Sequence, residues 1–254
     1  MGKFFEIVSI LIRYLFLYVV LALIQSIISD SLLIEYKHHI SILFSLVSIF
    51  IIFFIARFFD TLKRLNTNIL SSEIVLCYAI ISLSSILLIF FISWIGQGFS
   101  ISGEFNRDQK FLLLQVALYF GLLGGLKEEF FFRGIYFKLI EEKTNALWSL
   151  ALTTILFTLI HTGVNLFSIY SLFIFSLGFL CGTLRLVTGN VWISVIFHFL
   201  WNFTTTLVSG TDEISPLHNF LSKASSFYTD VIPAIIFLLL SLTLLIMKKY
   251  VSRR

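Results

Sequence analysis

Three short polar groups in otherwise apolar sequence contain the residues most able to do chemistry in this chain. They are Glu128-Glu129-x-x-x-Arg133, the single His161, and His198-x-x-x-Asn202. An ionisable side chain at membrane depth costs about 2.5 to 3.5 kcal/mol on insertion scales, so such residues usually face the protein interior and serve a function. The three groups therefore predict a buried catalytic centre.

The chemistry that this set predicts is the activation of water. A carboxylate shielded from bulk solvent is a usable general base, and a neutral imidazole beside it can orient the same water molecule. A second imidazole, together with an amide NH₂, can donate hydrogen bonds to a developing oxyanion. The combination predicts hydrolysis of an amide bond without a Ser or Cys nucleophile.

A zinc site is the alternative that these residues leave open. Glu128, His161 and His198 could supply three ligands, with water in the fourth position as in other catalytic zinc sites. The chain lacks the His-Glu-x-x-His motif of the familiar zinc proteases. Neither the metal-free interpretation nor the zinc interpretation therefore rests on that motif. No cofactor is assigned from the sequence, and zinc remains the open alternative.

Helical periodicity continues through the acidic pair and predicts one helix over about 111–140. With a rise of about 1.5 Å per residue, Glu128 then lies about 18 Å from the cytoplasmic end of that helix. Two later helices place His161 about 22 Å, His198 about 11 Å and Asn202 about 17 Å from the same side. We therefore expect the four residues to meet at intermediate depth.

Spacing within the first of these helices supports the arrangement. Glu129 and Arg133 are four residues apart, so they share a face and can pair, which lowers the cost of burying both. Gly121, Gly124 and Gly125 precede the pair and would let a neighbouring helix approach closely. Each polar group alone could also be structural, as an ion pair, a core histidine or an interhelical contact. Their conjunction at one depth favours catalysis.

The elements that position these residues are predicted to be membrane helices. Hydrophobic residues make up 58% of the 254 residues and charged residues 13%, whereas soluble domains have about 25% charged residues. Apolar runs of about 20 residues, enough to cross about 30 Å of hydrocarbon, lie near 7–28, 40–59, 74–95, 111–127, 146–164, 166–184, 191–208 and 231–247. We expect an all-α polytopic membrane helix bundle of about eight transmembrane helices. It would form a single domain over 1–254, with its catalytic core at about 111–208.

The distribution of basic residues predicts the orientation. Most of the 18 Lys and Arg residues fall on one side of the expected crossings, and by the positive-inside rule that side is cytoplasmic. Both termini would lie there. The same distribution accounts for the net charge of +4, so we expect no nucleic-acid partner. The expected location is an integral, multi-pass one, in the cytoplasmic membrane if the source is bacterial.

Other notable residues have simpler explanations at this stage. Arg185 lies near a helix end, where snorkelling of the side chain explains it. Cys77 and Cys181 lie in apolar runs without metal-ligand spacing, so both are expected to be buried and structural. The run Phe130–Phe132 could line a path for an apolar substrate.

The polar groups also resemble the motifs of a known family. Glu128-Glu129-x-x-x-Arg133, Phe157-x-x-x-His161 and His198-x-x-x-Asn202 occur here in the order and approximate spacing of the three motifs that define the CAAX-protease and bacteriocin-processing family (CPBP, or Abi). The motifs span about 128–202, and the surrounding helices fit that family's eight-helix architecture.

This resemblance implies an intramembrane endopeptidase related to the type II CAAX prenyl endopeptidase, which removes the last three residues of prenylated proteins. Carried over by motif, Glu128 and His161 would activate water. His198 and Asn202 would bind the oxyanion. The remaining Glu and Arg of the first motif would support the site.

The resemblance leaves the substrate class broad. CAAX-type proteins, peptide pheromones and bacteriocins are all compatible with it, so we expect a hydrophobic or lipidated peptide or protein substrate, surrounded by membrane lipid. A non-catalytic bacteriocin-immunity or membrane scaffold protein could retain the motifs. A proton-coupled transporter could use a buried Glu and two His as a relay. However, the inverted repeats and broken helices typical of transporters are not found in the sequence.

Overall fold

The computed structural model describes residues 72–97, 107–163, 165–209 and 227–251, together with residues 9, 12, 20, 46–47 and 50–51. Throughout these residues the regular structure is helical, which confirms the predicted all-α class. The expected spans near 7–28 and 40–59 lie mostly outside the described residues, and both termini lie outside them, so the count of eight and the predicted orientation remain predictions. The expected catalytic core lies within them, apart from residue 164.

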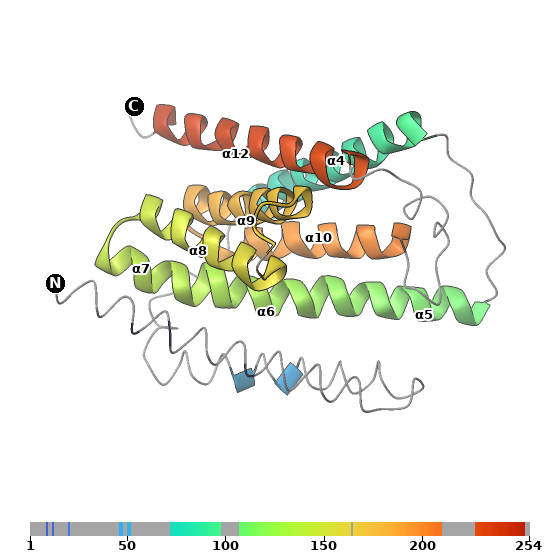
Figure 1. The fold of residues 1–254 in the computed structure, drawn as a ribbon, viewed down its shortest axis with the longest axis horizontal. Helices are drawn as coiled ribbons and strands as arrows, with labels where there is room; N and C mark the ends of the chain where they lie inside the picture. The colour runs from blue at the N-terminus through green and yellow to red at the C-terminus, as the bar shows by residue number, and fades with distance from the viewer. Residues whose placement is uncertain are drawn as a thin grey trace.

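A long helix over residues 107–143 is the element around which the site is built (Figure 1). It runs without interruption through α5 (Arg107–Leu118), the π-helix η1 (Tyr119–Gly124), α6 (Gly125–Glu129), the π-helix η2 (Phe130–Tyr136) and α7 (Phe137–Lys143). The prediction of one helix over about 111–140 is therefore confirmed. The two π segments, common at functional sites, flank the short α6 that ends with the acidic pair.

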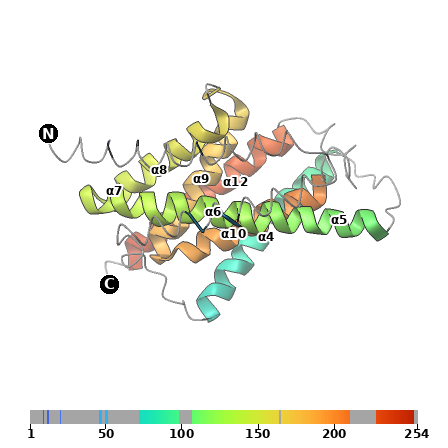
Figure 2. The same cartoon turned by 90° about the horizontal axis from the view of Figure 1, so that it is seen from below.

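Four further helices complete the described bundle around the site. They are α8 (Ala146–Thr162), α9 (Ile169–Thr188), α10 (Val191–Ser209) and α12 (Ile232–Val251), which follows the π-helix η3 (Phe227–Val231). An additional helix, α4 (Ser72–Gln97), packs against α10 and α12. Figure 2 shows the long helix crossing the bundle, with α10 beside its middle portion.

The chain is a helical membrane protein. Among the described residues, the segments Ile74–Ile92, Ile169–Thr188 and Phe227–Lys249 are long and apolar enough to cross a membrane. They differ in burial: 72% of the apolar window in α9 is buried, against 17% in α4 and 28% in the last segment. The helix α9 is therefore central. The helices α4 and α12 present apolar side chains outward, where lipid hydrocarbon can surround them.

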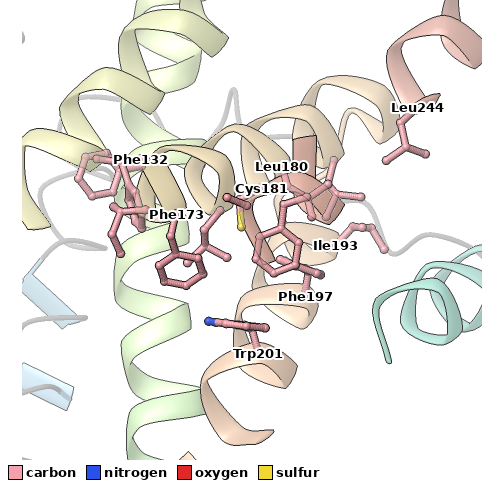
Figure 3. Close-up of a cluster of buried hydrophobic side chains, with 14 of the residues drawn as sticks. Phe132, Phe173, Leu180, Cys181, Ile193, Phe197, Trp201 and Leu244 are labelled. Atoms are coloured by element: carbon pink, nitrogen blue, oxygen red, sulfur yellow. The ribbon is translucent and has the colours of Figure 1, made fainter. Parts of the chain in front are cut away.

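Aromatic side chains from several helices fill the core (Figure 3). Phe237 packs edge-on against Phe197 and Trp201, with ring centroids 5.4 and 5.0 Å apart. The run Phe130–Phe132 is also interior, with each side chain at most 3% exposed. The prediction that this run lines a path for substrate is therefore wrong, because its rings pack against other core rings, including Phe157.

The two cysteines differ in environment. Cys181 is fully buried, as predicted, and lies within the aromatic core of Figure 3. Cys77 is exposed, so the prediction that it is buried is wrong. It lies on α4, whose apolar residues mostly face outward, so an apolar sequence context does not imply burial in this protein.

Glycines in the long helix allow α10 to approach, as predicted. A Cβ built on Gly125 would lie 3.2 Å from the backbone nitrogen of Phe199 and 3.6 Å from the carbonyl carbon of His198. A Cβ on Gly124 would meet only the Asn202 side-chain nitrogen, at an ordinary 3.8 Å. The α10 backbone that presents His198 therefore rests directly against Gly125.

We predict that Gly125→Ala lowers the melting temperature of the detergent-solubilised protein relative to Gly124→Ala. Alanine should stabilise a helix by about 0.5 to 1 kcal/mol at either position. At Gly125 this gain is opposed by the displacement of a packed backbone, whereas Gly124 has room for the methyl group. Thermal unfolding of the two variants side by side measures the difference, and equal melting temperatures would contradict the close approach.

Candidate active site

The structure brings together the residues that the three polar groups predicted. Glu128 and Glu129 end α6, and Arg133 follows within η2. His161 lies in the last turn of α8, and the pair His198 and Asn202 lies on α10. Helices far apart in the sequence therefore meet at one place.

Glu128 faces both histidines. Its Oε2 atom lies 3.4 Å from Nε2 of His161 and 3.9 Å from Nε2 of His198. The Glu128 and His161 side chains keep 16% and 24% of their surface exposed, whereas His198 keeps 3%. The carboxylate is thus shielded but accessible to a small molecule such as water.

The backbone of α8 fixes the tautomer of His161. Its Nδ1 atom lies 2.8 Å from the carbonyl oxygen of Phe157, and a carbonyl only accepts, so Nδ1 carries the proton. In the neutral ring Nε2 is then an acceptor, and it faces a carboxylate oxygen of Glu128 that is also an acceptor. A water molecule that donates one hydrogen to each of these atoms satisfies both. This pair could therefore hold and polarise a water molecule.

Glu129 has a different role from its neighbour. Its side chain is fully buried, and its Oε1 atom accepts from Nη1 of Arg133 at 3.0 Å and from Nδ1 of His198 at 2.8 Å. The predicted ion pair with Arg133 is confirmed. The bond to His198, 69 residues further along the chain, was not predicted. It turns the Nε2 edge of that ring toward Glu128.

Arg133 connects this network to the central helix. Its Nη2 atom donates to the carbonyl oxygen of Gly178 in α9 at 2.6 Å, and its guanidinium lies 4.6 Å from the centroid of the Phe157 ring. A Cβ on Gly178 would lie 2.9 Å from Cδ1 of Phe157 and 3.3 Å from Nη2 of Arg133. The absence of a side chain at Gly178 therefore makes room for the buried cation.

Arg185 is a positioning residue that the sequence analysis missed. It is 6% exposed, so the prediction that it snorkels from a helix end is wrong. Its Nε atom donates to the carbonyl oxygen of Arg133 at 3.3 Å, and its guanidinium lies 5.6 Å from the centroid of the Phe137 ring. The contact joins the end of α9 to the π-helix that follows the acidic pair. No local pattern around Arg185 distinguishes it from an ordinary helix-end arginine.

Asn202 and Cys181 complete the surroundings of His198. Asn202 lies one turn beyond His198 on α10 and faces the long helix near Gly124. Cys181 was also missed as a neighbour of the site. Its Sγ atom, a carboxylate oxygen of Glu129 and a ring nitrogen of His198 all lie within 4.8 Å of one another. Its sequence neighbours are mostly apolar, so only the fold reveals this proximity.

The donors around Glu128 are of types that zinc binds, although among the described residues it is Glu129, Cys181 and His198 that bring three such atoms within 4.8 Å of one another. Each histidine donates its Nδ1 proton to an oxygen, His161 to a carbonyl and His198 to a carboxylate, and presents Nε2 to Glu128. This is the usual arrangement behind zinc-binding histidines. Tetrahedral zinc with bonds of about 2.0 to 2.2 Å separates its ligand atoms by about 3.3 to 3.5 Å, and the separation of Glu128 and His161 is 3.4 Å. Both alternatives from the sequence therefore stay open.

Comparison with known proteins agrees with the motifs. Residues 110–204 match the family model described as type II CAAX prenyl endopeptidase Rce1-like. This segment is therefore similar to the Rce1-like family. The Rce1-like segment contains all seven residues of the three motifs discussed above, so the resemblance to the CAAX-protease family is confirmed.

A curated relative extends the similarity beyond the Rce1-like segment. The chain is 24% identical over 151 residues to the Bacillus subtilis (strain 168) protein named "Putative membrane peptidase YdiL". The match covers 54% of this chain and 59% of that protein, so the chain spans about three-fifths of the relative's length. No solved structure matches the chain.

We predict that Glu129 and Arg133 are energetically coupled. Breaking a buried pair by removing one partner typically costs about 3 to 5 kcal/mol, because a charge is left uncompensated in the interior. Glu129→Leu and Arg133→Met should each lower the melting temperature markedly. The double variant should lose less than the two single losses combined. A double-mutant cycle by thermal unfolding in detergent tests this, and additive losses would argue against coupling.

Proposed function

We propose that this chain is an intramembrane endopeptidase that hydrolyses a peptide bond with water activated by Glu128 and His161. One observation carries the proposal: Oε2 of Glu128 faces Nε2 of His161 at 3.4 Å, and Nδ1 of that ring is committed to a carbonyl oxygen, so in the neutral ring both facing atoms are acceptors. The similarity of the segment that contains them to a peptidase family supports this reaction over other uses of a buried Glu and His.

The first step is attack by water on the substrate carbonyl. Glu128 takes one proton from the water while His161 accepts a hydrogen bond from the other hydrogen, and the water oxygen bonds to the carbonyl carbon. The carbonyl oxygen becomes an oxyanion. The Glu128 proton then passes to the leaving nitrogen as the carbon–nitrogen bond breaks, which restores the carboxylate and releases an acid and an amine.

The proposed oxyanion site consists of Asn202 and His198. The amide NH₂ of Asn202 can donate in any protonation state of the site, whereas Nε2 of His198 can donate only when it carries a proton. Because Nδ1 already donates to Glu129, donation from Nε2 requires the imidazolium form. Glu129 would then play the part of the buried carboxylate in a catalytic triad, which orients the ring and stabilises the imidazolium.

A hydrophobic or lipidated peptide is the proposed substrate, of CAAX type or of peptide pheromone or bacteriocin type, met within a cytoplasmic membrane. An apolar cavity of about 600 Å³ supports an apolar substrate group. It lies between α8 and the start of α9, and Thr158, three residues before His161, is part of its wall. A chain held there would lie along the helix that presents His161.

Zinc is the second chemistry that the geometry favours, through the Nδ1 contacts of both histidines. Glu128, His161 and His198 would hold the ion. It would supply a Lewis acid and a more acidic bound water. In that case the same three residues bind the metal, and Asn202 remains the oxyanion donor.

We predict that the purified protein contains no stoichiometric zinc and keeps its activity after treatment with a chelator. Glu128 and His161 suffice to polarise water without a metal ion. Elemental analysis by mass spectrometry, paired with an activity assay before and after chelation, makes the test. Zinc at one equivalent that is lost together with activity would instead support the zinc chemistry.

We predict that Glu128→Gln abolishes proteolysis while protein level and melting temperature stay close to those of the unmodified protein. The amide has nearly the same shape as the carboxylate but is not a base. Glu142→Gln is the matched control, because Glu142 is exposed on α7 and lies outside the site. Small membrane-associated and secreted peptides are compared by mass spectrometry in cells that express each form.

A peptide that is shortened with the unmodified protein and with Glu142→Gln, but not with Glu128→Gln, would identify the bond that is cut. If no peptide differs and a deletion phenotype is rescued equally by all three forms, the proposed hydrolysis is wrong. A non-catalytic immunity or scaffold protein would then account for the fold.

A further inference from the structure

We propose that Glu129, Cys181 and His198 form a second site, which binds a thiophilic divalent cation such as Zn²⁺ or Cd²⁺ and thereby inhibits the enzyme. The inhibition rests on the proposed function, whereas binding of the cation does not. The site lies at the Glu129 edge of the His198 ring, away from the Nε2 atom that faces Glu128.

The donor set is one that zinc and cadmium prefer. A thiolate sulfur, an imidazole nitrogen and a carboxylate oxygen are all ligands of structural and catalytic zinc sites. The three atoms already lie within 4.8 Å of one another. Zinc bonds of about 2.0 to 2.3 Å would place them about 3.3 to 3.7 Å apart. A contraction of at most about 1.5 Å, spread over three side chains, would complete the site.

An unsatisfied atom points to a ligand at this place. Oε2 of Glu129 is buried and accepts no hydrogen bond from a nitrogen or hydroxyl donor, although Oε1 of the same carboxylate has two donors; the Cys181 thiol beside this carboxylate is a weak donor at most. A buried carboxylate oxygen without a donor is costly. A cation held by Oε2 and the Cys181 sulfur would satisfy it. The remaining contacts of Glu129 with Arg133 could persist through Oε1.

The backbone of Cys181 is held in place by a hydrogen bond from α10. Oγ of Ser194, on α10, donates to the carbonyl oxygen of Cys181 at 2.7 Å. The bond joins α9 to the helix that carries His198. The thiol and the imidazole therefore come from helices that are fixed relative to each other, which lowers the entropy lost when the cation binds.

Binding of the divalent cation releases one proton. The Cys181 sulfur exchanges its hydrogen for the metal, and that proton goes to solvent. A neutral His198 that binds the metal through Nδ1 carries its own proton at Nε2 instead. The ring can no longer donate to Glu129, and the contraction of the three ligands around the ion moves it from the position in which Nε2 faces Glu128. Inhibition follows from this displacement of the shared histidine.

The two cysteines of the chain allow a sharp binding test. Cys77→Ser keeps only Cys181, and Cys181→Ser keeps only the exposed Cys77. On titration with Cd²⁺, we expect the ultraviolet charge-transfer absorption of a cadmium–thiolate bond to saturate at one equivalent in folded Cys77→Ser. We also expect its melting temperature to rise, because the cation binds the folded state. Cys181→Ser should show neither effect.

The proposal is overturned if Cys77→Ser shows no saturable absorption, or if Cys181→Ser and Cys181→Ala bind Cd²⁺ as tightly as Cys77→Ser does. The activity test uses the peptide identified with the unmodified protein. Cd²⁺ should reduce cleavage at least tenfold in Cys77→Ser and leave Cys181→Ser unaffected. Binding through Cys181 without any loss of cleavage would overturn the inhibition. Binding in a protein that cleaves no peptide would leave the cation site standing and remove the proposed function.

Discussion

The buried carboxylate of Glu129 is the constraint on which the rest of the site depends. One of its oxygen atoms accepts from Arg133 and from His198, so a single group joins the long helix to α10. The cost of burying this charge is offset only while both donors stay in place. Any movement of α10 relative to the long helix therefore breaks a buried hydrogen bond. The hydrogen bond from His198 to Glu129 therefore fixes the position of the imidazole through protein groups alone.

A second layer of contacts holds Arg133 in turn. Its guanidinium donates to the carbonyl oxygen of Gly178 and lies over the ring of Phe157, and its own carbonyl accepts from Arg185. Phe157 also supplies the carbonyl that fixes the tautomer of His161. The two histidines are thus oriented through contacts that share Arg133 and Phe157. The carbonyl of Arg133 that accepts from Arg185 lies within the π-helix η2.

The sequence was sufficient for what depends on local spacing and composition. The helical class, the long helix through the acidic pair, the pairing of Glu129 with Arg133 and the approach of α10 at Gly125 all follow from patterns within one segment. Contacts between helices could not be predicted from patterns within one segment. The bond from His198 to Glu129 joins residues 69 positions apart, and the contact of Arg185 with Arg133 spans 52. Spacing along the chain carries no information on these.

Burial was the property that the sequence described least well. Cys77 and Cys181 both lie in apolar runs, yet one faces outward on α4 and the other lies in the core on α9. In a membrane protein an apolar residue is stable in lipid as well as in the interior, so hydropathy does not separate the two environments. The exposure of Arg185 was predicted wrongly for a related reason, because a long side chain near a helix end can reach outward or inward. Only the neighbouring helix decides which.

The contrast between Glu128 and Glu129 shows how burial assigns roles to adjacent residues of one type. Glu129 is fully buried, which keeps water away from its carboxylate, and its Oε1 is committed to two donors. Glu128 keeps some exposure and faces Nε2 of His161, an acceptor in the neutral ring, so its lone pairs remain available to a water molecule. The base and its support are therefore distinguished by their partners.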